Sequence, residues 1–439
     1  MIRPLLILCL SLSVSLPLSA SEKTVSCDLP VKSQKRGVCL NEVDAKDFLA
    51  LAPGVSWYYT WHFADTNHAP EEAKITFIPM AWGNRDADLK GLAEYLKSHR
   101  PPFVLAINEP NLKGQAFIDP KTTAELYLKI KAVADKFGIP VVGPNMALGS
   151  GGPDSISAMD PIENRNVTYT FQNPFLKAFL FYLSKTNVYA LGSHTYGNIG
   201  ELKWLTDMMP KEFNCPVWVT EFADWSAPNA DAEIDYMIQS VDLMERSPKV
   251  QGYAWFKERV KDNPKLSLLE DKPGSLTPLG EAFVNMPVHD PAVYYRLPGR
   301  LQLESYTTMV GADIARTKDA DGFLEVKVLD SKAWLDYQIF SDRAEIFTAQ
   351  LRLATSEDAK IELLSGDKVL ATFTASVKGW KTLNAPVALP AGKSTFRLRS
   401  NRATRLNWIE FTRQKRMGDL PSASKNPASG GINPFLGIL

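Results

Sequence analysis

The first two thirds of the chain alternate short apolar runs with amphipathic stretches, and this alternation restricts the possible folds more than any other feature. Most runs are rich in Val, Ile and aromatic residues with little polar alternation, which is typical of parallel strands buried on both faces. The amphipathic stretches between them predict helices, for example at residues 86–98, 121–137, 174–184 and 230–246. The eight apolar runs lie at residues 36–40, 55–61, 75–82, 103–110, 139–145, 189–197, 216–222 and 250–256.

Eight strand–helix units in about 250 residues fit the arithmetic of a (β/α)8 TIM barrel, which we predict for residues 21–287. The alternative is a doubly wound open sheet. That alternative is disfavoured because no glycine-rich phosphate-binding turn follows the first run. The predicted fold class of this part of the chain is therefore α/β.

The sequence pattern changes after Pro287, where prolines mark a linker at residues 288–299. Residues 300–412 contain short alternating strands separated by turn residues, which predicts an all-β sandwich of the jelly-roll type. Because the linker is short, we expect a fixed or semi-rigid arrangement of the two domains. The last segment, 413–439, is basic, then rich in Ser, Pro and Gly, then apolar, and is predicted to be a flexible tail.

The N-terminal segment 1–20 is typical of a secretory signal peptide, with Arg3, an apolar stretch and small residues before a cut after Ala20. No later stretch is long and apolar enough to be a membrane-spanning helix. We therefore expect a secreted or periplasmic protein. An oxidising compartment permits one disulfide among Cys27, Cys39 and Cys215; Cys27 and Cys39 are nearest in sequence, but all three pairings remain open.

Composition excludes several classes of function. The 49 Lys and Arg residues balance 49 Asp and Glu residues, so a strongly basic nucleic-acid surface is not expected. Five His residues without an HExxH pair, and cysteines without a CxxC pair, argue against a zinc site or a thioredoxin-type centre. We predict no cofactor for catalysis, no nucleic-acid or membrane partner, and a monomer.

Two carboxylates stand where apolar runs end. Glu109 follows the fourth run and Glu221 closes the seventh, and catalytic groups of barrels sit at the C-terminal ends of strands. The alternative is that each Glu closes a structural ion pair, which is less favoured for two such residues than for one. Two carboxylates about 5–5.5 Å apart across a pocket are the machinery of a retaining glycosidase, in which one protonates the leaving oxygen and the other attacks the anomeric carbon.

Aromatic and polar side chains near the ends of other runs suit the faces and hydroxyls of sugar rings. Some of the aromatic residues could instead pack under the barrel floor, and His194 could contact either the substrate or the nucleophilic Glu. The candidate substrate-binding residues are Trp57, Tyr59, Trp61, Trp82, His194, Tyr196 and Trp255.

The order of these motifs over about 250 residues resembles glycoside hydrolase family 128. The matching segments are 36–37 (RG), 56–61 (SWYYTW), 77–83 (FIPMAWG), 108–110 (NEP), 193–196 (SHTY), 218–222 (WVTEF) and 253–256 (YAWF). The resemblance implies a retaining β-1,3-glucanase on a (β/α)8 barrel, with Glu109 as acid and base, Glu221 as nucleophile and Asn108 on the 2-hydroxyl. The family has endo- and exo-acting members, and we expect endo action.

The C-terminal part resembles carbohydrate-binding module family 6, through segments 301–306 (LQLESY), 334–337 (WLDY), 379–380 (GW), 389–392 (LPAG) and 406–411 (LNWIEF). By that resemblance, Trp380 and Asn407 would bind sugar, and a structural calcium would lie on Gln302, Glu304 and Glu410. The usual last ligand is Asp, so Glu410 departs from the pattern. The domain could bind sugar weakly or be purely structural.

The sequence leaves two other functions open. One is a β-glucan-binding protein that has kept a cleft without turnover, against which the presence of both Glu109 and Glu221 argues. The other is a glycosidase of a different specificity, such as β-1,4-glucan, β-1,6-glucan or mannan, since linkage is set by loop shape that the sequence does not predict.

Overall fold

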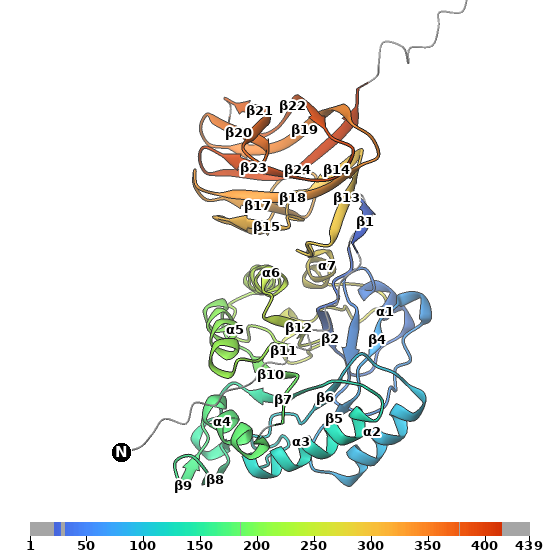
Figure 1. The fold of residues 1–439 in the computed structure, drawn as a ribbon, viewed down its shortest axis with the longest axis vertical. Coiled ribbons are helices and arrows are strands. Elements are labelled where there is room, and N and C mark those ends of the chain that lie inside the picture. The colour runs from blue at the N-terminus through green and yellow to red at the C-terminus, as the bar shows by residue number, and fades with distance from the viewer. Residues whose placement is uncertain (1–21, 28–30, 185, 377, 415–439) are drawn as a thin grey trace, which may run out of the picture.

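A computed structural model describes residues 22–27, 31–184, 186–376 and 378–414. It shows an α/β region followed by an all-β region, which lie one above the other in Figure 1. The predicted signal peptide, 1–20, lies outside the described residues, as does the predicted tail beyond residue 414. Within the described residues, no helix is both long and apolar enough to cross a membrane.

The α/β region is built on a nine-stranded parallel sheet with the strand order β4-β3-β2-β12-β11-β10-β7-β6-β5. Each of the eight predicted runs overlaps a strand of this sheet, and the third run contains two. The strands are β2 (Arg36–Cys39), β3 (Trp57–Tyr59), β4 (Thr76–Phe77), β5 (Met80–Ala81), β6 (Val104–Ala106), β7 (Val141–Ala147), β10 (Ala190–Thr195), β11 (Val217–Phe222) and β12 (Val250–Trp255).

The prediction of a closed TIM barrel is wrong, because the sheet is curled but open. Its two end strands, β4 and β5, come from the single predicted run 75–82 and pair on opposite sides, β4 with β3 and β5 with β6. At the break, the Ile78 N–H donates to the Tyr58 carbonyl, whereas the Pro79 carbonyl accepts from the Leu105 N–H. Proline has no N–H of its own, so the ladder is interrupted where the two halves separate.

Helices surround this sheet (Figure 1) and begin where polar side chains cap them. Asp44, Asp119, Asn198, Asn229 and Thr277 each accept a backbone N–H of the first helical turn. A one-turn 3₁₀ helix alone connects β3 to β4, so the strand–helix alternation lapses there. The helices are α1 (Ala45–Leu51), α2 (Asp86–Ser98), α3 (Pro120–Asp135), α4 (Gln172–Leu183), α5 (Ile199–Phe213), α6 (Ala230–Arg246) and α7 (Pro278–Asn285).

Aromatic rings fill one end of the curled sheet. Trp57, Phe103 and Trp218 pack against one another with ring centroids 4.2 to 5.6 Å apart. Neighbouring strands carry glycine where these rings lie: a Cβ on Gly37 would come within 2.3 Å of Trp57, and one on Gly252 within 2.1 Å of Trp218. The rings form a packed floor beneath the opposite end, where the strands terminate in polar residues.

The all-β region consists of two sheets, which confirms the prediction of an all-β C-terminal part. Burial alternates strictly along β18, as expected of strands with one face on a core. The first sheet contains β1 (Lys23–Ser26), β13 (Val293–Leu297), β15 (Thr308–Val310), β18 (Trp334–Ser341), β20 (Ala359–Ser365), β21 (Lys368–Ala375) and β23 (Gly392–Ser400). The second contains β14 (Gly299–Gln302), β16 (Ala312–Arg316), β17 (Leu324–Val328), β19 (Glu345–Thr355), β22 (Gly379–Leu389) and β24 (Thr404–Arg413).

The two regions are joined more closely than a linker alone would join them. The N-terminal strand β1 pairs in parallel with β13, and β13 itself lies inside the predicted linker 288–299. On the face of α6, Arg316 of β16 pairs with Asp231 at 2.9 Å. Nearby, the buried Asp242 accepts from His289 at 3.1 Å and from the Tyr306 hydroxyl.

The three described cysteines form no disulfide with one another. Cys39 is fully buried beneath the polar end of the sheet, where its thiol donates to the Thr220 carbonyl at 3.4 Å. The Cys27 thiol donates instead to the Arg296 carbonyl at 3.2 Å. The disulfide expected from sequence proximity, Cys27 to Cys39, is therefore not present.

Candidate active site

Glu109 is held at the end of β6 by an unusual backbone path. Ile107 and Glu109 both have positive φ angles, 59° and 44°, which side-chain-bearing residues rarely adopt. Hydrogen bonds to β7 fix this path: the Glu109 N–H donates to the Asn145 carbonyl at 2.7 Å, and the Asn145 N–H donates to the Ile107 carbonyl at 2.9 Å. The strained turn directs the carboxyl group into the pocket, as often occurs at functional sites.

Glu221 is held by three side-chain donors. Its Oε1 accepts from the Trp61 indole N–H at 2.8 Å and from the Tyr59 hydroxyl at 3.1 Å, and its Oε2 accepts from the Tyr196 hydroxyl. Burial first, and then the charge of Glu221, raise the pKa of Tyr196 well above its usual value. The phenol therefore remains a donor, and the carboxylate is fixed in one orientation.

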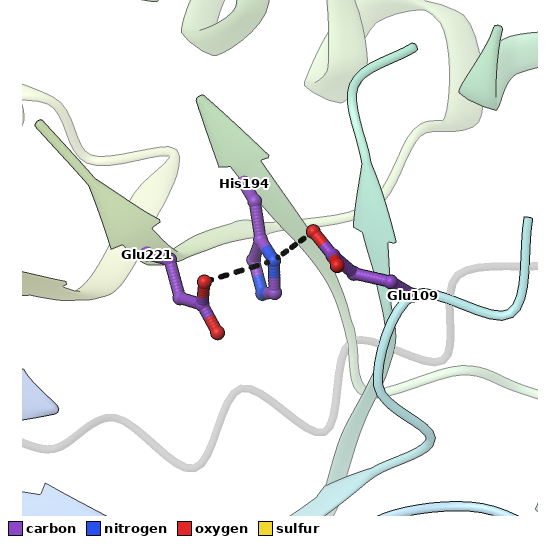
Figure 2. Close-up of side chains that lie close together, drawn as sticks. All are labelled: Glu109, His194 and Glu221. Atoms are coloured by element: carbon purple, nitrogen blue, oxygen red, sulfur yellow. Dashed lines mark hydrogen bonds and ion pairs between the residues drawn. The ribbon is translucent and has the colours of Figure 1, made fainter. Parts of the chain in front are cut away.

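His194, on β10, lies between the two carboxylates (Figure 2). Its Nδ1 is 2.8 Å from an oxygen of Glu109 and 3.4 Å from an oxygen of Glu221. Burial alone would lower the pKa of His194, but the charges of Glu221 and Glu109 raise it above the usual value. The imidazole thus couples the two acids electrostatically.

One atom from each of these three side chains lies within 4.8 Å of the others, and all three residues are buried. Residue types and spacing of this kind could also accommodate a transition-metal ion. The three donors already bound to Glu221 nevertheless describe a carboxylate that is oriented by the protein itself.

Glu109, His194 and Glu221 line a cleft of about 870 Å³. Carboxylates lie at its centre and aromatic rings at its walls, an arrangement that can bind a flexible polar ligand with apolar faces. The predicted residues that line the cleft are Asn108, Glu109, Trp61, Trp82, His194, Tyr196 and Glu221.

Three predicted aromatic residues lie elsewhere. Trp57 is 2% exposed and belongs to the packed floor, with its indole N–H donating to the Lys35 carbonyl. Trp255 is fully buried, donates to the Leu266 carbonyl and packs against Phe222. The assignment of these two residues to substrate is therefore wrong, because both faces of the sheet are buried and alternation does not tell the pocket from the core. Tyr59 is also fully buried and reaches Glu221 from below.

The cleft contains residues that the sequence did not single out. Trp225 is 43% exposed and lies four residues after Glu221; Phe256 packs edge-on against both Trp61 and Tyr196. Lys257, Gln115 and Asn41 also line the cleft. Phe256 directly follows strand β12 and belongs to the segment 253–256 that carries the family resemblance, although it was not predicted to bind substrate; the loop residues carried no signal.

The predicted sugar-binding residues of the sandwich are partly covered. Asn407 is fully buried, and its amide donates to a side-chain oxygen of Asp319 at 2.9 Å and to the Asp321 carbonyl. Trp380 is half-buried, with the guanidinium groups of Arg405 and Arg352 5.3 and 5.8 Å from its ring. Their role in sugar binding stays a prediction.

The predicted calcium ligands fit the ion only in part. Gln302 and Glu304 line one pocket at the junction of the two regions, and a buried oxygen of each has no hydrogen-bond partner among the described residues. Such oxygens are suitable calcium ligands. Glu410 does not fit, because its carboxylate is bound by Arg300 at 2.8 and 3.0 Å.

Comparison with known proteins identifies the class of protein that this cleft defines. Residues 37–283, more than half of the chain, match the family model described as the glycosyl hydrolase catalytic core. The chain belongs to this family of glycosyl hydrolases. Residues 302–413 match carbohydrate binding module family 6. Both family-level predictions are confirmed, although no curated protein matches the chain.

Solved structures similar to the α/β region are described as members of GH128. A subgroup II endo-β-1,3-glucanase from Pseudomonas viridiflava is 29% identical, with 59% of this chain and 100% of that chain covered and a TM-score of 0.50. A subgroup II enzyme from Sorangium cellulosum is 28% identical, over 58% and 100% of the two chains, with a TM-score of 0.49. A subgroup VI exo-β-1,3-glucanase from Aureobasidium namibiae is 22% identical, over 57% and 96%, with a TM-score of 0.44.

Proposed function

We propose that the protein is a retaining endo-β-1,3-glucanase with Glu109 as acid and base and Glu221 as nucleophile. The observation that carries the proposal is the spacing of the pair, whose nearest oxygens lie within 4.8 Å across the cleft (Figure 2). Retaining enzymes hold their carboxyl groups about 5–5.5 Å apart, whereas inverting enzymes leave about 6.5–9.5 Å for a water molecule. The short spacing supports the retaining mechanism.

In the first step, the Glu221 carboxylate attacks the anomeric carbon as the glycosidic C–O bond breaks. Glu109 gives its proton to the leaving oxygen, so the departing glucan ends in a new hydroxyl. A glycosyl ester on Glu221 remains. The three donors that fix Glu221 keep its oxygens aimed along this path, which lowers the cost of orienting the reactants.

In the second step, Glu109 is a carboxylate and takes a proton from an incoming water. The water oxygen attacks the anomeric carbon, the ester bond breaks, and Glu221 leaves as a carboxylate. The negative charge moves from Glu221 to Glu109 and back during one cycle. His194 Nδ1 faces both groups and can stabilise whichever one is charged.

The β-1,3-glucan substrate is supported by the Pseudomonas viridiflava enzyme, an endo-β-1,3-glucanase that is similar over the whole of its own length. The cleft offers the appropriate groups. Asn108 binds Gln115 through its amide, while its buried Oδ1 has no partner in the described part of the chain and can accept a sugar hydroxyl. Trp61 and Trp82 supply flat apolar surfaces on the walls.

The experiment is a hydrolysis panel of linear β-1,3-, β-1,4- and β-1,6-glucans and mannan. Wild type is expected to release products from the β-1,3-glucan alone, as a ladder of oligosaccharides that indicates endo action. Glu221→Gln and Glu109→Gln are each expected to lower kcat at least about 1,000-fold. The exposed Glu163→Gln is the matched control and should retain full activity. Binding of the glucan without turnover, or release from another polymer alone, would contradict the proposal.

Three further expectations belong to this proposal. The sandwich is proposed to bind carbohydrate, on the strength of its family match. A structural calcium is proposed on Gln302 and Glu304, where it would neutralise a buried carboxyl group and brace the domain junction. Secretion or a periplasmic location is proposed from residues 1–20, and a mature N-terminus at Ser21 would test it.

A further inference from the structure

The loop at residues 223–229, here called the Trp225 loop, connects the nucleophile strand β11 to α6. Its tryptophan lines the cleft with 43% of its surface exposed. The indole ring and the Tyr196 ring form a T-shaped contact, with ring centroids 6.2 Å apart and planes at 79°. Tyr196 also donates its hydroxyl to Glu221, so a single side chain, that of Tyr196, connects the exposed indole to the proposed nucleophile.

Polar contacts hold the loop in place. The Asp224 N–H donates to Glu233 Oε1 at 3.0 Å, and the Trp225 N–H donates to the Tyr196 carbonyl at 3.3 Å. Lys265 donates from its ammonium group to the carbonyls of Trp225, at 3.2 Å, and Ala227. The position of the loop therefore depends on Glu233 and Lys265, which do not line the cleft, as well as on Tyr196, which does.

Glu233 is the unusual member of this set. Its side chain lies in the first turn of α6 and is fully buried, yet its only hydrogen-bond partner in the described residues is the loop N–H. The second oxygen, Oε2, is unpartnered there. Helix capping does not account for it, because Asn229 already caps α6. A buried carboxyl group with so few partners is costly, and its one bond is to the loop.

We propose that the Trp225 loop is a glucan-binding element, with Trp225 as the stacking platform for a glucosyl unit beyond the cleaved bond and Glu233 as the positioning residue that holds the platform. The inference rests on the proposed glucanase function and names a binding site for that substrate. A flat, exposed indole beside a carboxylate-lined cleft offers the apolar face that a pyranose ring requires. Glu233 does not touch the substrate in this scheme.

The charge state of Glu233 gives the proposal a pH signature. Burial is the main cause that raises the pKa of Glu233 to about 8, and the neighbouring charge of Asp224 adds to it. The hydrogen bond from the Asp224 N–H and the charge of the Lys265 ammonium group act in the opposite direction. Tyr236 also faces it from α6 and stays protonated, because burial raises its pKa. Glu233 is therefore a neutral acid at pH 7. Above about pH 8 it ionises beside Asp224, and the loop is expected to loosen.

The experiment measures kcat and KM on laminarihexaose, a β-1,3-linked glucose hexasaccharide, between pH 6 and pH 9. Trp225→Ala is expected to raise KM about 10-fold with little change in kcat. Glu233→Ala should raise KM about 3- to 10-fold, and the double variant should be no worse than Trp225→Ala alone, since both act through one ring. Glu233→Gln, which mimics the neutral acid, should match wild type at pH 7 and lose the alkaline rise in KM.

Each contrary result identifies what has failed. An unchanged KM in Trp225→Ala overturns the platform, and additive effects in the double variant overturn the positioning role. If Glu233→Ala does not fold, the Glu233→Gln variant decides instead: a rise in KM at alkaline pH that this variant retains overturns the positioning role of Glu233. Calorimetry with the same hexasaccharide separates this proposal from the proposed function: binding that Trp225→Ala weakens, without turnover, refutes the glucanase alone, while neither binding nor turnover refutes both.

Discussion

Tryptophans beside the cleft and tryptophans on the sandwich have different partners. Trp61 donates its indole N–H to Glu221, the proposed nucleophile, and Trp225 leaves its ring exposed. On the sandwich, guanidinium groups lie over the rings: Arg397 is 3.9 Å from Trp334, and Arg300 is 4.0 Å from Trp408. Trp82 is intermediate, since Arg85 lies 5.0 Å above its ring at the rim of the cleft.

The covering arginines are themselves fixed by acids. Arg397 binds Asp336 through two hydrogen bonds, and Arg405 binds Glu325 in the same way beside Trp380. A cation–π contact of about 0.5–2 kcal/mol would have to be given up before a sugar could stack on such a ring. The two groups of tryptophans therefore differ in whether a ring face is free, and under the proposed function only a free face can serve as a platform for a sugar ring.

The largest expected effect lies at the three donors that hold the proposed nucleophile Glu221, namely Tyr59, Trp61 and Tyr196. Tyr196→Phe removes one donor to Glu221, and we expect kcat to fall about 100-fold, in the range seen when one donor is removed from a charged transition state. Tyr294→Phe, on β13 far from the cleft, is the matched control. Initial rates on laminarihexaose measure both. Equal rates for Tyr196→Phe and wild type would mean that the Tyr196 hydroxyl does not orient Glu221 for the proposed reaction.

The next effect concerns His194, which the two carboxylates hold with a raised pKa. A His whose pKa is raised on folding stabilises the folded state below its ordinary value of 6.5, and this contribution is lost as pH rises through the folded pKa. The free energy of unfolding of wild type, minus that of His194→Gln, should therefore decrease from pH 5 to pH 9. Urea unfolding measures it. A difference that grows with pH would show that the imidazole is neutral and merely packed.

A smaller effect is expected on the sandwich. Trp380→Ala should weaken binding of the full chain to insoluble β-1,3-glucan by less than about threefold, because Arg405 and Arg352 lie over its ring. Sedimentation of the protein with the polymer measures it, with Trp225→Ala as the comparison. A tenfold loss in Trp380→Ala would show that sugar displaces the arginines, and would remove the contrast between the two regions.

The smallest effect concerns calcium at the junction of the regions. Added calcium should raise Tm by about 4 °C, which corresponds to about 1 kcal/mol for a domain of about 110 residues. Glu304→Gln should abolish the rise, while Glu410→Gln should leave it intact because Arg300 already binds that carboxylate. A rise that Glu410→Gln abolishes and Glu304→Gln retains would reverse the assignment.

The sequence predicted the strand positions well because each buried parallel strand leaves an apolar run of its own. It did not predict that the run 75–82 divides between two neighbours, since pairing partners are distant in sequence. For the same reason, the placement of β1 beside β13 could not be anticipated. Local pattern identifies a strand, whereas its neighbours are decided by packing of the whole sheet.

The candidate site was predictable where chemistry is tied to a strand end. The sequence placed three of the candidate residues at the ends of β6, β10 and β11, and the structure brings their side chains together there. These residues are Glu109, His194 and Glu221. Trp57 and Trp255 were misplaced, because an aromatic residue on a strand buried on both sides can face floor, pocket or helix. Trp225 was missed because its loop is shaped by Glu233 and Lys265, whose contacts with it depend on the folded structure.

The most direct test of the central claim is proton NMR of a β-1,3-glucan oligosaccharide during its first minutes of hydrolysis. The claim is that Glu109 and Glu221, with oxygens within 4.8 Å, act by double displacement. The account predicts that the newly released reducing ends appear first as the β-anomer and mutarotate later to the equilibrium mixture. First appearance of the α-anomer would show inversion through a water between the carboxylates, and would contradict the assignment of Glu221 as a nucleophile.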